Sequence, residues 1–184
     1  VLASDEKRRI AVKAASLIPN NSSLMINIGT TTEQIAHVLR GKHGILVITN
    51  SINVVNTLQG AADIEVIIAG GLVRPTDGGV VGEATVDFIR QFKMDYAIVS
   101  ASAIDEDGSI LDYDYREVKV AQAIIENARH CILVADSTKF ERSAPVRIGH
   151  ISQLSSFVTD NPPPSSFAAV CKENDVDLIV VEEI

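Results

Sequence analysis

The sequence predicts an α/β fold with a Rossmann-like, doubly wound and mainly parallel sheet. Short apolar runs rich in β-branched residues recur along the chain, and segments with helical spacing of apolar residues separate most of them. This alternation is typical of parallel sheets that helices cover on both faces. The chain has 184 residues, of which 46% are hydrophobic, so it can bury one substantial core. We therefore expect a single domain over residues 1–184.

The first element is expected to be a helix over residues 5–18. Ile10, Ala14, Leu17 and Ile18 recur there at helical spacing. Seven apolar runs predict strands, at residues 24–28, 45–49, 65–69, 96–101, 131–136, 156–160 and 178–182. Five amphipathic segments predict further helices, at residues 31–40, 51–59, 83–92, 116–128 and 165–174. The order is repeatedly a strand followed by a helix, which is what a doubly wound sheet requires.

The residues that follow each strand are the candidates for a binding site, because ligands of open parallel sheets bind beyond the carboxyl ends of the strands. Gly29, Thr30, Thr31 and Thr32 end the first strand and open a helix, where free N–H groups and the helix dipole attract anions. The other candidates follow later strands, open the helix at 116–128 or supply charge: Lys7, Thr49, Asn50, Ser51, Gly70, Gly71, Arg74, Arg116, Glu117, Lys119, Asp136 and Lys139.

The expected anion is small, because the sequence has neither the GxxxxGK[ST] motif of nucleotide triphosphate sites nor the GxGxxG motif of dinucleotide sites. Threonine hydroxyls and backbone N–H groups suit a monophosphate, with Lys7 and Arg74 as charge partners. Carboxylates such as Glu117 accept hydrogen bonds from hydroxyl groups, and ammonium groups such as Lys139 pair with anions. We therefore expect a pocket for a sugar or polyol phosphate, without a cofactor or a metal ion.

Each candidate position also has a purely structural interpretation. Thr30–Thr32 could cap a helix, as could Asn50 and Ser51, and Gly70–Gly71 could form an ordinary turn. The charged segment REVK at residues 116–119 could be a solvated helix face. Only the joint placement of these residues at strand ends favours a ligand site.

Charge and cysteine content restrict the class of protein. The net charge is −8 and no segment is rich in lysine and arginine beyond the three residues 7–9, which argues against direct binding of nucleic acid by this chain. Cys131 and Cys171 lie in no CxxC pair, so buried thiols in a reducing cytoplasm are expected. No apolar run reaches the length of a membrane span. The chain starts at Val1, so we expect it to be a fragment of a longer protein.

Several segments resemble the C-terminal effector-sensing domain of DeoR-type repressors of sugar metabolism. They are IGTTT, VITNS, AGGLVR, GVVGEATVDFIRQFKMD, IDEDGSILDYDYREVKVAQAIIENARH and LVADSTKF, and the match extends over nearly the whole chain. Within that family, GEATVDFI, DYDYREV, IIENARH, APVRIGHIS and TDNPPP are most similar to members that regulate glycerol metabolism. The resemblance implies a transcriptional repressor whose effector is a sugar or polyol phosphate, and glycerol 3-phosphate is the favoured effector.

The same resemblance implies features outside this chain. A winged helix-turn-helix DNA-binding domain would precede Val1 in the intact protein and would make all contacts with operator DNA. The regulator would be a homo-oligomer, and the phosphorylated effector would release it from its operators.

The fold of that family is similar to ribose-5-phosphate isomerase, so the alternative function is a sugar-phosphate isomerase. The isomerase motifs are matched by Gly29–Thr32, by Arg116–Glu117 with Lys119 displaced by one place, and by Asp136 with Lys139. Val99 and Ser102 stand where the isomerase has two aspartates. Because proton transfer between neighbouring carbons needs correctly placed carboxylates, we expect a binding site and no enzyme. A third alternative is an oligomerisation module that binds no small ligand.

Overall fold

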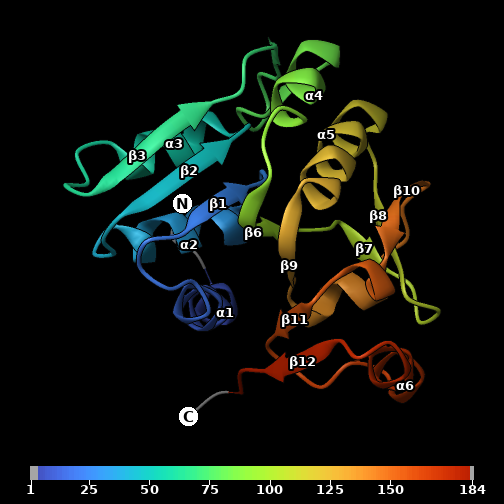
Figure 1. Cartoon of the computed structure of the whole chain (residues 1–184). Helices are drawn as coiled ribbons and strands as arrows, with labels where there is room; N and C mark the ends of the chain where they lie inside the picture. Colours follow the sequence, from blue (N-terminus) through green and yellow to red (C-terminus); the bar gives the residue numbers. More distant parts are fainter. Residues whose placement is uncertain (1–3, 183–184) are drawn as a thin grey trace.

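A parallel sheet of seven strands forms the centre of the structure (Figure 1), a computed structural model that describes residues 4–182. The strands are β1 (Ser23–Ile26), β2 (Ile45–Thr49), β3 (Ile64–Ile68), β6 (Met94–Val99), β9 (Ala128–Val134), β11 (Ser156–Thr159) and β12 (Asp177–Val180). Their order is β12-β11-β9-β6-β1-β2-β3, and each neighbouring pair is parallel. The predicted α/β fold and all seven predicted strands are confirmed.

The direction in which strands are added to the sheet reverses between β1 and β6. From β1 the chain adds β2 and β3 on one side, and from β6 it adds β9, β11 and β12 on the other. The two central strands pair directly, with Ile26 opposite Ile98. Loops that leave neighbouring strands at such a reversal diverge to opposite faces of the sheet, and the resulting crevice at the carboxyl ends is the usual ligand site of this architecture.

In the part of the chain that the structure describes, six α-helices cover the sheet, three on each face (Figure 1). One face carries α1 (Asp5–Ser16), α2 (Thr30–Leu39) and α3 (Ile52–Leu58), and the other carries α4 (Glu83–Ile89), α5 (Tyr115–Glu126) and α6 (Ser165–Glu173). Successive residues of β1 divide between the two cores: Leu24 and Ile26 pack with the first three helices, and Met25 packs with the second core. This alternation is the period of two that a strand imposes on its side chains.

Small antiparallel elements complete the fold, and the sequence did not predict them. A hairpin is formed by β4 (Leu72–Val73) and β5 (Val80–Val81), and β7 (Ala103–Ile104), β8 (Ser109–Asp112) and β10 (Val146–His150) form a second sheet. Two 3-10 helices are also present, η1 (Ser137–Glu141) and η2 (Ile151–Gln153). Strands of two residues show no periodicity, so their pairing depends on the surrounding tertiary structure.

The predicted helices are confirmed with boundaries that differ by a few residues. The predicted strand at 96–101 ends at Val99, so Ser100 and Ala101 lie in the loop beyond the sheet. Among the described residues, no helix is long and apolar enough to cross a membrane.

Candidate ligand-binding site

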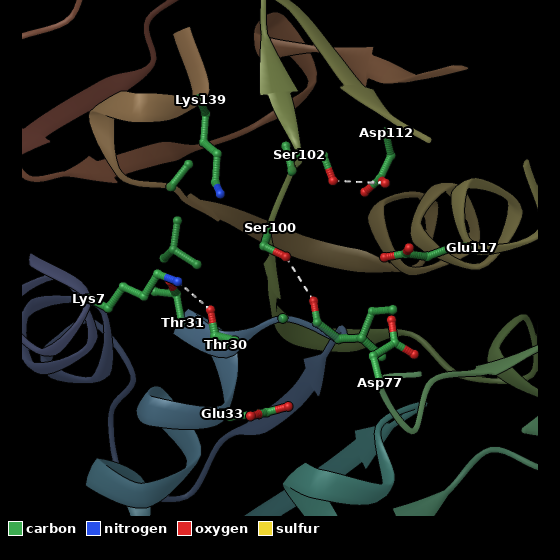
Figure 2. Close-up of a pocket in the computed structure, with 15 residues that line it drawn as sticks. Lys7, Thr30, Thr31, Glu33, Asp77, Ser100, Ser102, Asp112, Glu117 and Lys139 are labelled. Carbon is green, nitrogen blue, oxygen red and sulfur yellow. Dashed lines mark hydrogen bonds between the residues drawn. The ribbon is translucent and has the colours of Figure 1, made fainter. Parts of the chain in front are cut away.

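A cavity of about 250 Å³ opens at the carboxyl ends of β1, β6 and β9, where strand addition reverses direction. Gly29, Thr30 and Thr31 reach it from the turn after β1, and Ser100–Ser102 reach it from the loop after β6. Figure 2 shows the polar side chains that surround it. The cavity therefore lies where the topology of the sheet places a ligand site.

The start of α2 forms one wall of the cavity. Helix α2 begins at Thr30, so the N–H groups of its first turn have no carbonyl partner within the helix. Lys7, on α1, donates a hydrogen bond of 2.7 Å from Nζ to Oγ1 of Thr30. This contact holds an ammonium group at the positive end of the helix dipole, and the two together favour a bound anion.

Gly29 is required by the geometry of this turn. Its φ of +143° is unfavourable for residues with a side chain, and a Cβ atom would lie 2.6 Å from Oγ of Ser100. Ser100 donates from that same Oγ to the carbonyl oxygen of Ile28, at 2.8 Å. The glycine thus allows the loops after β1 and β6 to approach each other at the edge of the cavity.

Lys139 supplies a second cation to the cavity. Its side chain is largely buried, and Nζ lies 3.8 Å from Oδ2 of Asp136. Burial lowers the pKa of Lys139, the charge of Asp136 opposes this, and the positive charges of Arg142 and Lys7 lower it further. Lys7 and Lys139 therefore repel each other, and a bound anion would reduce this repulsion.

Carboxylates form the opposite wall, from Asp77, Asp112 and Glu117 (Figure 2). Asp112 accepts two hydrogen bonds at Oδ1, from Oγ of Ser102 at 3.0 Å and from the N–H of Tyr113 at 2.7 Å. Burial raises the pKa of Glu117 to about 7, and the negative charge of Asp112 contributes to this rise. Apart from Glu33, a carboxylate in the first turn of α2 that also lines the cavity, the acidic and the cationic side chains thus lie on opposite walls.

Arg74 lies outside the cavity lining and ties the β4–β5 hairpin to α5. Its guanidinium pairs with Asp77, with Asp114 at 2.8 Å and with Glu117 at 3.2 Å. Asp114 is the N-cap of α5 and also accepts from the N–H of Arg116. The charge of Arg74, which we predicted to assist the phosphate, is therefore engaged by three carboxylates in this structure.

Six of the predicted site residues line the cavity: Lys7, Gly29, Thr30, Thr31, Glu117 and Lys139. The other predicted residues lie outside its lining: Thr32, Thr49, Asn50, Ser51, Gly70, Gly71, Arg74, Arg116, Lys119 and Asp136. Asp136 nevertheless adjoins it, because it caps η1 and sits beside Lys139.

Hydroxyl groups outside the lining form structural hydrogen bonds. Thr32 donates to the carbonyl oxygen of Gly29, at 2.8 Å, and Thr49 donates to that of Ile26, at 2.6 Å. Ser51 caps α3 by accepting from the N–H of Val54. Of the capping functions that the sequence left open as alternatives, the structure shows that of Ser51, while Thr32 and Thr49 bond to backbone carbonyls instead.

Asn50 and the two glycines after β3 position the β4–β5 hairpin. The side-chain amide of Asn50 donates to the carbonyl oxygen of Val80, at 3.1 Å. The carbonyl oxygen of Gly70 accepts from Thr85, at 2.7 Å, and a Cβ atom on Gly71 would lie 2.1 Å from Oγ1 of Thr85. Close packing therefore explains Gly71, whereas a Cβ atom on Gly70 would meet no other heavy atom within 4 Å.

The charged segment at the start of α5 divides between two faces of the helix. Glu117 points into the cavity (Figure 2). Arg116 and Lys119 are exposed and line a different surface hollow, where Nζ of Lys119 lies 5.2 Å from the centre of the Tyr115 ring. Arg116 and Lys119 are three residues apart and therefore share one face of the helix. Glu117, the residue after Arg116, lies on a different face.

Some lining residues were not among the predicted binding residues: Glu33, Asp77, Ser100, Ser102 and Asp112. The two serines lie at the end of the fourth predicted strand, Ser100 within residues 96–101 and Ser102 directly after them, and this position could have identified both. Asp112 ends β8, a short strand that the sequence did not predict, and Asp77 lies in the hairpin between β4 and β5. Glu33, in the first turn of α2, accepts a hydrogen bond of 2.8 Å from Asn53.

The arrangement can bind a molecule with an anionic end and a neutral polar end. Lys7, Lys139 and the start of α2 suit the anion, and the carboxylates of Asp112 and Glu117 suit hydroxyl groups. Within residues 4–182, no group of three or more His, Cys, Asp or Glu side chains has a geometry that could hold a metal ion.

Solved structures with this fold include enzymes and translation factors. Ribose 5-phosphate isomerase A from Neisseria gonorrhoeae aligns over 78% of this chain and 54% of its own, with a TM-score of 0.53 and 17% identity. The β subunit of eIF2B from Chaetomium thermophilum aligns over 83% of this chain and 47% of its own, with a TM-score of 0.59 and 16% identity. The chain thus spans about half the length of each, and identities this low establish similarity of fold alone.

Two relatives share far more sequence. The chain is 49% identical over 175 residues to the glycerol-3-phosphate regulon repressor of Escherichia coli (strain K12), covering 95% of this chain and 69% of the relative. It is 48% identical over 158 residues to the repressor of the same name from Haemophilus influenzae, covering 86% of this chain and 62% of the relative. The family model of the DeoR C terminal sensor domain matches residues 2–161. The chain therefore belongs to the family of DeoR C-terminal sensor domains.

Proposed function

We propose that this sensor domain binds a phosphorylated polyol in the cavity at the carboxyl ends of β1 and β6, and that the effector is glycerol 3-phosphate. The observation that carries the proposal is the pairing of Lys7 with Thr30 at the start of α2, opposite the carboxylates of Asp112 and Glu117. Two relatives that are named glycerol-3-phosphate regulon repressors, at 49% and 48% identity, support this choice of effector.

The phosphate would bind at the cationic wall. There the N–H groups of the first turn of α2 and the hydroxyls of Thr30 and Thr31 can donate hydrogen bonds, while Lys7 and Lys139 supply positive charge. A hydrogen bond to a charged group contributes about 1.5–3 kcal/mol, so several of them make the phosphate the main source of affinity. Free glycerol should therefore bind far more weakly.

In the intact regulator, a separate winged helix-turn-helix domain would contact operator DNA, and the sensor domains would assemble a homo-oligomer in the cytoplasm. The net charge of −8 supports the assignment of DNA binding to a separate domain, because an acidic domain is repelled by the phosphate backbone of DNA. Residues 1–184 alone should not retard duplex DNA in a gel at moderate salt.

The chain would sense its ligand without converting it. Val99 is buried in the hydrophobic core, and Ser102 is paired with Asp112, at the two positions where the isomerase resemblance requires aspartates. Each general acid or base contributes about 10²- to 10⁴-fold to a rate, so turnover of ribose 5-phosphate should stay at background. Formation of ribulose 5-phosphate above that background would contradict the proposal.

Calorimetric titration tests the choice of ligand. Glycerol 3-phosphate should bind, and glycerol and hexose phosphates should bind far more weakly. Lys139→Met should weaken the binding of glycerol 3-phosphate by about tenfold or more, because it removes one charge-assisted contact. The control is Lys172→Met, which removes an exposed lysine on α6 and should leave the affinity unchanged. Equal affinity for glycerol and glycerol 3-phosphate, or equal effects of the two variants, would refute the proposed site.

A further inference from the structure

We infer that the acidic wall of the cavity makes the site selective for phosphate esters whose far end is uncharged, and that Asp112 is the residue that determines this selectivity. The inference rests on the proposed function, because it assumes that the phosphate occupies the cationic wall. It adds a class of ligand that the site rejects: phosphate esters that carry a carboxylate or a second phosphate at the other end.

The separation of charge across the cavity is the first observation. Figure 2 shows Lys7 and Lys139 on one side of the cavity and Asp77, Asp112 and Glu117 on the other. A ligand whose phosphate sits beside Lys7 must direct the rest of its chain away from that wall. In a cavity of about 250 Å³, a chain of three carbons extends toward the carboxylates.

The fixed position of Asp112 is the second observation. Asp112 is only 7% exposed, and Ser102 and the Tyr113 N–H both donate to its Oδ1. Within residues 4–182, no group donates a hydrogen bond to Oδ2, so this oxygen can accept one from a ligand hydroxyl. A carboxylate that is already oriented in this way needs no rearrangement to bind a hydroxyl group.

The third observation, for the part of the chain that the structure describes, is that the cations near the acidic wall are already engaged by carboxylates. Lys139 lies beside Asp136 and is also attracted by Asp112. The guanidinium of Arg74 is already shared by Asp77, Asp114 and Glu117. The raised pKa of Glu117 indicates that this region already disfavours a further negative charge. A ligand carboxylate placed here would lose its water and meet acceptors instead of donors.

Two three-carbon phosphate esters differ in the charge of the end that lies far from the phosphate. Glycerol 3-phosphate ends in a hydroxymethyl group, and 3-phosphoglycerate ends in a carboxylate of similar size. The phosphate contacts are the same for both, so the ratio of their affinities reports on the far end of the cavity alone. Inorganic phosphate, titrated separately, reports on the cationic wall.

The experiment is calorimetric titration of the chain with both esters at about 0.15 M salt, which screens charges more than roughly 8 Å apart. The wild type should bind glycerol 3-phosphate at least tenfold more tightly than 3-phosphoglycerate. Asp112→Asn should reduce this ratio to threefold or less, because the amide is neutral and can donate a hydrogen bond to a carboxylate. The control is Asp175→Asn, which removes an exposed charge after α6 at a φ of 58° that asparagine also adopts, and should preserve the ratio.

The outcomes separate the inference from the proposed function. If glycerol 3-phosphate binds and 3-phosphoglycerate binds equally well to the wild type, the selectivity is overturned and the proposed function stands. If Asp112→Asn keeps its melting temperature and the ratio does not fall, Asp112 is not the determinant. If no phosphate ester binds, the proposed function fails and the inference fails with it. The wild-type ratio does not depend on the variant's folding, so it tests the selectivity even if Asp112→Asn unfolds.

Discussion

Glu117 should make the protein more stable as the pH falls from 8 to 5.5. Burial raises the pKa of Glu117 from its ordinary value of 4.5 to about 7, and the charges of Asp112 and Asp77 add to the rise, although Arg74 opposes it. A carboxyl group whose pKa is raised in the folded state binds its proton more tightly there than in the unfolded state. Its contribution to stability is therefore complete below pH 4.5 and is lost as the pH rises through about 7.

The size of the effect follows from the two pKa values. The difference between 4.5 and about 7 corresponds to about 3 kcal/mol of unfolding free energy, of which about 2 kcal/mol falls between pH 8 and pH 5.5. For a domain of this size, that amounts to a rise in melting temperature of roughly 4–8 °C. Asp114 acts in the opposite direction at lower pH: burial opposes ionisation, but hydrogen bonds from Arg74 and Arg116 lower its pKa to about 2. Its contribution is lost only as the pH falls below about 4.

Thermal unfolding of the ligand-free protein across pH 5.5–8 measures this dependence. The variant Glu117→Gln removes the titrating group while keeping a side-chain oxygen for Arg74, so its melting temperature should vary far less over the same range. Glu173→Gln, an exposed position on α6, is the matched control and should follow the wild type. A wild-type melting temperature that stays constant or falls on acidification, or an equal slope in Glu117→Gln, would refute the reasoning.

Three further predictions concern the core and the turn after β1. Phe167→Ala should lower the unfolding free energy by about 3–5 kcal/mol in denaturant titrations, because Phe167 is fully buried and packs edge-on against Phe157. Cys131 should react with a thiol reagent only at the rate of unfolding, since burial raises its pKa to about 11; rapid labelling of the native protein would contradict this. Gly29→Ala should cost about 1–3 kcal/mol of stability and weaken ligand binding, because it strains the backbone and crowds Ser100; unchanged melting and affinity would show that the turn adapts.

The sequence by itself determined the α-helices, the strands of the main sheet and part of the site. Continuous apolar runs and helical spacing are local patterns, so they located the seven strands of the sheet and all six α-helices. The glycine and threonines after the first strand were identified for the same reason, because the turn and the start of α2 are contiguous in the chain. Lys139 was identified because it follows a strand that ends at the same edge of the sheet.

Only the tertiary structure decided which strand ends are neighbours and which charged side chains pair with one another. The adjacency of β1 and β6 brings Ser100 beside Gly29, although the two residues lie far apart in the chain. Asp112 reaches the cavity through a small antiparallel sheet that leaves no periodic signal. The charge of Arg74 is engaged by three carboxylates, two of which, Asp77 and Glu117, line the cavity. Side chains pair through space after the backbone has folded, so a list of residues at strand ends cannot separate those that form the ligand site from those that cap helices and hold the fold together.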